Sequence, residues 1–137
     1  MKKLMMIGVA FVCATVITGC GNPREKMVRE LYNVLQSGDT SKMDNFAKEN
    51  FDGALAEMLR HDRSMKRKFA AISDSKSTVK VRTVTERSDE GGKGALVAAE
   101  CNGITLYFVV GSEKGKTDKI TFVTDDGEVV KQIMSAQ

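Results

Sequence analysis

This chain of 137 residues has one histidine, one proline, three cysteines and no tryptophan. Two of the cysteines lie in the first twenty residues, so only Cys101 remains in the rest of the chain. One cysteine cannot form a disulfide framework, and a hydrophobic core has to stabilise the fold. One histidine and one cysteine cannot supply the ligands of a zinc site either. No phosphate-binding glycine loop and no serine nucleophile motif occurs, and we expect neither a metal nor a cofactor.

An excess of positive charge is also lacking once the first nineteen residues are set aside. Lys2 and Lys3 account for two of the 21 basic residues, which leaves 19 basic against 18 acidic residues. So small a net charge gives no general attraction to nucleic acid. Aromatic residues make up only 6% of the chain and do not alternate with basic ones, so stacking on bases is not expected. The composition therefore excludes nucleic acid as a partner.

The amino end has the residue order of an export signal. Two lysines precede an uncharged apolar stretch over residues 4–16, and small residues follow before Cys20. The alternative is an uncleaved helix that crosses a membrane, which needs about 20 apolar residues. Only sixteen residues separate Lys3 from Cys20. We therefore interpret residues 1–19 as a signal peptide.

The sequence Ile17-Thr18-Gly19-Cys20 resembles the lipobox of bacterial lipoproteins. In that family the cysteine thiol accepts a diacylglyceryl group, the chain is cut just before it, and the new amino terminus accepts an acyl chain such as palmitate. Two or three acyl chains hold a protein firmly, since each buried methylene adds about 0.8 kcal/mol. The resemblance implies that residues 20–137 form one domain, anchored to the cell membrane through lipid on Cys20 without spanning it. An Asp after the cysteine would signal retention in the inner membrane. Here Gly21 follows, which implies the outer membrane if the cell has two.

Three stretches after the signal have the apolar spacing of amphipathic helices. They cover residues 23–37, 39–51 and 55–72. The first is the best defined, because Asn22, Pro23 and Glu25 supply a cap, a first-turn proline and a capping-box acid. Gly38 then ends it.

From residue 77 onwards the apolar residues alternate, and the sequence predicts five strands. They cover residues 77–87, 94–101, 104–110, 118–124 and 128–134. Val84 breaks the alternation of the first strand, which indicates a β-bulge or a strand covered on both faces. The pairs Asn102-Gly103 and Asp126-Gly127 are signals for two-residue hairpin turns. The strand over 104–110 is nearly all apolar, and we expect it to be central in an antiparallel meander.

Helices followed by a meander predict an α+β fold in which the N-terminal helices pack on one face of a curved antiparallel sheet. This layout resembles the nuclear transport factor 2-like superfamily, in particular its small bacterial lipoproteins of unknown function. The resemblance depends on three features: the helix over residues 25–36, the turn at 37–39 into a helix that ends at Phe51, and the late turn at 125–127. Many members have a tryptophan just after that turn, where this chain has Glu128. The resemblance implies a cone-like α+β roll whose mouth can hold a small molecule. In some relatives an Asp with a His or Tyr inside the cone acts as acid and base.

This chain has no obvious match to such a catalytic pair. His61 is the only histidine and lies among charged neighbours, so we interpret it as a surface residue. The adjacent acids at 89–90 and 125–126 sit beside glycine, where they serve turn geometry. Cys101 ends an alternating apolar run, which favours a small buried residue over a reactive thiol. We therefore expect that the chain has no catalytic residue and is not an enzyme.

The most unusual feature is a basic run between residues 60 and 68. Its cations are Arg60, Arg63, Lys66, Arg67 and Lys68. Positions 60, 63 and 67 fall on one face of the expected helix, opposite the apolar stripe. One interpretation is a contact for anionic head groups or for an acidic protein partner, with each surface cation adding about 1 kcal/mol near an anionic membrane. The other is the solvated back of a helix, with no role in recognition.

Three functions stay open at this point. The leading hypothesis is a non-enzymatic, membrane-tethered binding or interaction domain of the cell envelope that uses the concave face of the sheet or the basic run. The alternative is an enzyme of the same fold for a small hydrophobic substrate, which requires a polar residue of shifted pKa inside the cone. The third is an immunity or exclusion lipoprotein that blocks a partner at the membrane.

Overall fold

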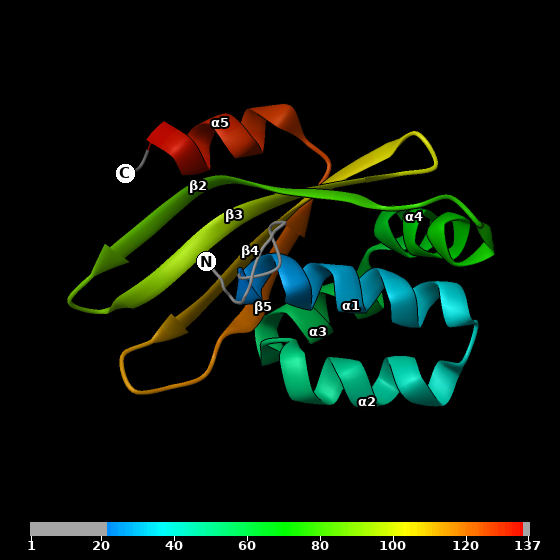
Figure 1. The fold of residues 1–137 in the computed structure, drawn as a ribbon, viewed down its shortest axis with the longest axis horizontal. Coiled ribbons are helices and arrows are strands. Elements are labelled where there is room, and N and C mark those ends of the chain that lie inside the picture. Colours follow the sequence, from blue (N-terminus) through cyan, green and yellow to red (C-terminus); the bar gives the residue numbers. More distant parts are fainter. Residues whose placement is uncertain (1–21, 136–137) are drawn as a thin grey trace, which may run out of the picture.

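A computed structural model describes residues 22–135, which form five helices and a four-stranded sheet (Figure 1). The helices are α1 (Pro23–Ser37), α2 (Thr40–Asn50), α3 (Gly53–His61), α4 (Arg63–Asp74) and α5 (Gly127–Ser135). The strands are β2 (Lys80–Asp89), β3 (Gly92–Cys101), β4 (Ile104–Glu113) and β5 (Lys119–Thr124). Neighbouring strands pair antiparallel in the order β2-β3-β4-β5, in an open sheet. The predicted α+β class is confirmed.

Helices cover both faces of the sheet, whereas the sequence predicted helices on one face (Figure 1). Val97 and Phe108 belong to a core that includes residues of α1 to α4. Side chains alternate along a strand, so Leu96 and Ala98 point to the opposite face. Both are buried, and Ile133 of α5 lies near Leu96 across a small cavity. The additional cover on this face is therefore α5.

The first helix begins and ends where the sequence predicts. Asn22 Oδ1 accepts hydrogen bonds from the backbone nitrogens of Arg24 (3.0 Å) and Glu25 (3.4 Å). Gly38 ends the helix in the left-handed region at φ 71°, a conformation that costs glycine little. The carboxylate of Glu25 has a different role from the predicted capping box, since it accepts hydrogen bonds from Thr83 of β2.

The predicted single helix over residues 55–72 is wrong, because the chain breaks at Asp62. Asp62 has extended backbone angles and caps two helices at once. Its backbone nitrogen donates to the oxygen of Met58 at 3.1 Å, which ends α3. Its Oδ1 accepts from the nitrogen of Met65 at 2.9 Å, which begins α4. The local competition between an Asp side chain and the helical backbone is the physical reason for the break.

The early part of the sheet agrees with the sequence pattern. The register of β2 against β3 shifts between Thr83 and Thr85, which places an irregularity at the predicted position, Val84. Asn102 and Gly103 have φ angles of 56° and 73°, as the tight turn between β3 and β4 requires. β4 lies inside the sheet, as its apolar sequence predicted.

The predicted fifth strand over residues 128–134 is wrong, because this segment is α5. Asp126 does not form a hairpin turn with Gly127. Its Oδ1 accepts from the nitrogen of Glu128 at 2.9 Å, and its backbone oxygen accepts from Val130 at 3.1 Å. The apolar residues of this segment also suit helical spacing, and an acidic first turn favours a helix start.

The space between α1 and the sheet is filled by large apolar side chains. Tyr32 and Phe108 are the largest of the fully buried residues, and their rings meet edge to face at a centroid distance of 6.1 Å. Leu31, Ile72 and Leu106 are fully buried as well. Burying a large apolar side chain contributes about 1.5–3 kcal/mol relative to exposing it, so this core stabilises the described domain, in which Cys101 is a free cysteine.

Candidate functional site

The signal peptide and Cys20 lie outside the described residues. The part of the chain that the structure describes begins at Asn22, two positions after Cys20. Between residues 22 and 135, no helix combines the length and apolar character needed to cross a bilayer.

The predicted basic run surrounds the junction of α3 and α4. We call Arg60, Arg63, Lys66 and Arg67 the basic surface, since all four are exposed. Arg60, Arg63 and Arg67 were predicted to share one face of a single helix, but Arg60 lies in α3 and the other two lie in α4, beyond the break at Asp62. Lys66 Nζ donates to the backbone oxygen of Arg60 at 2.6 Å, so the two helices are still linked at this surface.

Lys68, the fifth predicted cation, does not belong to the basic surface, because other residues of the fold bind its ammonium group. Its Nζ pairs with Asp125 Oδ2 at 2.9 Å and donates to Ser64 Oγ at 3.0 Å. Its side chain is only 27% exposed. Lys68 therefore connects α4 to the segment after β5, and little of its charge is available to a ligand.

Two arginines of the basic surface have no acidic partner among the described residues. Arg60 pairs with Glu57 at 3.5 Å, in a contact where both side chains are mostly exposed. No ion pair found between residues 22 and 135 involves Arg63 or Arg67. Their guanidinium groups are free to donate to phosphate or carboxylate oxygens from outside.

His61 is a surface residue, as predicted. Its side chain is 76% exposed in the last turn of α3, and Nε2 lies 3.2 Å from Glu57 Oε1. This neighbour sits four positions away on the same helix, so the contact is local.

Cys101 is buried, as its place in the alternating run predicted. It is 1% exposed, and its sulfur lies 3.5 Å from Gln36 Nε2 and from the backbone oxygen of Ser77. Through these contacts the end of β3 packs against the last turn of α1.

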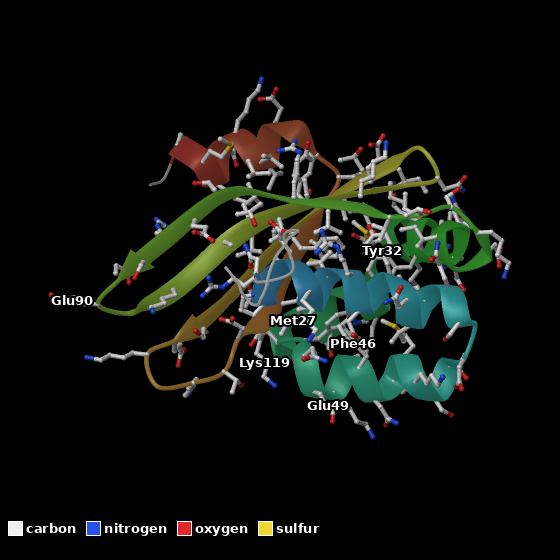
Figure 2. The ribbon with its side chains drawn as sticks, in the orientation of Figure 1. Met27, Tyr32, Phe46, Glu49, Glu90 and Lys119 are labelled. Atoms are coloured by element: carbon white, nitrogen blue, oxygen red, sulfur yellow. The ribbon has the colours of Figure 1, made fainter. Side chains whose placement is uncertain are left out.

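Tyr32 is a buried residue with a polar group that the sequence did not single out (Figure 2). Its hydroxyl is buried without a hydrogen-bond partner in the described part of the chain. Burial, and secondarily the nearby Cys101, raise the pKa of this hydroxyl far above its ordinary value. The hydroxyl therefore stays protonated and cannot serve as a base near neutral pH. Its spacing four positions after Val28, on the buried face of α1, was the signal available in the sequence.

Of the adjacent acids, Asp89 has the turn role that the sequence predicted, whereas Asp125 and Asp126 have other structural roles. Asp89 Oδ1 accepts from the nitrogens of Gly91 (2.8 Å) and Gly92 (3.1 Å), and so shapes the turn between β2 and β3. Asp126 caps α5, and Asp125 pairs with Lys68. Over the described range, His, Cys, Asp and Glu side chains form no cluster of three that could hold a metal ion.

Cavities occur on the α5 side of the sheet. One of about 110 Å³ lies between Ile133 and the strands, with Leu96 and Val109 in its lining. A wider cavity of about 330 Å³ is lined by Arg87 and Gly111 and extends to Gly91 in the β2–β3 turn. Neither is lined by Tyr32 or by a residue of the basic surface.

We compared the chain with protein-family models, curated proteins and solved structures, and none of the three comparisons gave a match.

Proposed function

We propose that this chain is a lipid-anchored protein of the cell envelope, held to the membrane through lipid on Cys20, with a non-enzymatic domain that binds an anionic ligand at the basic surface. The lipobox resemblance at residues 17–20 supports the anchor. Gly21 after the cysteine supports the outer membrane where two membranes exist.

The layout of the domain supports a relation to the nuclear transport factor 2-like superfamily. Two helices precede Phe51, which forms a parallel bridge with Ile120 of β5, and two more helices precede the meander. In this proposal the sheet is the wall of a cone, and Tyr32 and Phe108 fill the cone from within. A filled cone favours binding on the outside of the domain over binding in its mouth.

The observation that carries the binding proposal is that Arg63 and Arg67 have no acidic partner between residues 22 and 135. Both are exposed near Lys66, whereas Lys68 is paired with Asp125. Exposed charges that the fold leaves unpaired are available for phosphate or carboxylate groups on head groups or on an acidic protein.

The enzyme alternative requires a polar residue of tuned pKa that a substrate can reach. Tyr32 has a shifted pKa, but the shift moves away from neutrality and its side chain is 0% exposed. Its burial thus favours a role in packing.

Cosedimentation of the lipid-free domain with phosphatidylglycerol vesicles tests the binding proposal. Replacing Arg63 and Arg67 with Gln should weaken binding, and added salt should weaken it steeply because exposed charges are screened over about 8 Å at physiological ionic strength. The matched control replaces Lys42 and Lys48 with Gln, which removes the same charge from the exposed surface of α2. His61→Gln should change little. Binding that ignores both salt and the arginine substitutions would contradict the proposal.

A further inference from the structure

The start of α1 is fixed to the sheet by side chains far apart in the sequence. Asn22 Nδ2 donates to Thr83 Oγ1 at 3.1 Å. Thr83 donates from its backbone nitrogen (3.0 Å) and its hydroxyl (2.6 Å) to Glu25 Oε2. Arg24 pairs with Asp118, just before β5, at 3.4 Å. These contacts tie Asn22 to the body of the domain.

The lipid proposed for Cys20 would be attached very close to this fixed point. Only Gly21 separates Cys20 from Asn22. A residue of extended chain spans at most about 3.6 Å, so the two Cα atoms lie within about 7 Å of each other. The acyl chains and the folded domain are therefore joined without a long linker.

The segment at 114–118 lies close to this fixed point, and the β2–β3 turn lies farther out on the same side, beyond the end of β2. We call the first turn of α1, the β2–β3 turn at 90–91 and the segment at 114–118 the anchor end. Asp118 belongs to this segment and reaches Arg24, and the nitrogen of Lys114 donates to the oxygen of Gly91 at 3.1 Å. Figure 1 shows both segments at the end towards which α1's first turn points, and Figure 2 shows Glu90 there.

The opposite end of α1 marks the far end of the domain. Gln36 in its last turn donates to the backbone oxygen of Ser77 at 2.8 Å and lies 3.5 Å from Cys101 Sγ, next to the turn at Asn102. A helix of 15 residues is about 22 Å long, so the Asn102 turn lies on the order of 20 Å from the lipid attachment point.

We infer that the anchor end rests on the head groups of the anchoring membrane and the Asn102 turn points away from it. This inference rests on the proposed lipid attachment. The anchor end carries both signs of charge, with Lys114 and Lys116 beside Glu90 and Asp118. The short link thus sets the orientation, and charge attraction does not.

Depth measurements on the lipidated full chain test this orientation. A fluorophore is placed at Lys116→Cys or at Asn102→Cys in a Cys101→Ala background, and the vesicles carry a quencher on their head groups. Quenching should be several-fold stronger at position 116 than at 102, and raised salt should not change this ratio. If Cys101→Ala impairs folding, Cys101 can be kept, because it is buried and poorly accessible to the label. Equal quenching, or stronger quenching at 102, would overturn the inference.

A linker variant provides the matched control. Twelve Gly and Ser residues inserted between Gly21 and Asn22 should remove the difference between the two positions. A difference that persists would show that the link does not set the orientation. A chain that does not float with vesicles contradicts the proposed lipid anchor, whereas a floating chain with equal quenching contradicts the orientation alone.

Discussion

Lys68 in α4 pairs with Asp125, the residue that follows β5, with 2.9 Å between Nζ and Oδ2. Both side chains are partly exposed, so the pair should add only about 0.2–1 kcal/mol to stability. Lys68→Gln should lower the free energy of unfolding by this amount, while Arg67→Gln, which breaks no pair, should leave it nearly unchanged. Urea unfolding of both variants and of a Lys68→Gln/Asp125→Asn double variant measures the coupling. Fully additive losses would contradict the pairing.

Tyr32→Phe should stabilise the protein. The hydroxyl is buried and unpaired among the described residues, and such a group costs about 1–3 kcal/mol. The raised pKa also gives a pH dependence. The folded state holds the Tyr32 proton to higher pH than the unfolded state, whose tyrosine ionises near about pH 10. The wild-type protein should therefore lose stability as pH rises above that value, and Tyr32→Phe should lose less. Parallel curves for the two proteins above pH 10 would count against this account.

The contact of Glu25 with Thr83 should stabilise the start of α1. A hydrogen bond to a charged group contributes about 1.5–3 kcal/mol, so Thr83→Val should lower stability by a value near the bottom of this range. Thr83→Ser keeps the hydroxyl and should lose much less. Glu30→Gln, on the exposed face of the same helix, is the control for loss of an acid. Equal stability of the Val and Ser variants by urea unfolding would refute the role of the hydroxyl.

Asp62 should be more costly to replace than other acids of the helical layer. Its Oδ1 caps α4, and loss of a cap costs about 1 kcal/mol. Asp62→Ala should lower the thermal midpoint, whereas Asp44→Ala, exposed within α2, should not. Differential scanning calorimetry distinguishes the two. An unchanged midpoint for Asp62→Ala would mean that the break between α3 and α4 does not depend on this cap.

The sequence predicted best where the structural signal is local. The ends of α1 and the Asn102-Gly103 turn depend on residues that are close together in the sequence. Both features were placed correctly. α5 was missed because a short apolar run fits a strand and a helix equally, and only Asp126's contacts and the sheet face beneath it decide. The exposure of Arg63 and Arg67 was foreseeable from their neighbours. The pairing of Lys68 with Asp125 was not, because the tertiary fold alone brings these two residues together.

The most direct test of the account is the mass of the chain purified from bacterial membranes. We predict a polypeptide that begins at Cys20 and carries a diacylglyceryl group on that residue, with residues 1–19 removed. Replacing Cys20 with Ala should leave an uncut, unlipidated precursor that a fatty-acid probe does not label. A chain that keeps residues 1–19 without lipid, or normal probe labelling of the Cys20→Ala variant, would contradict the account.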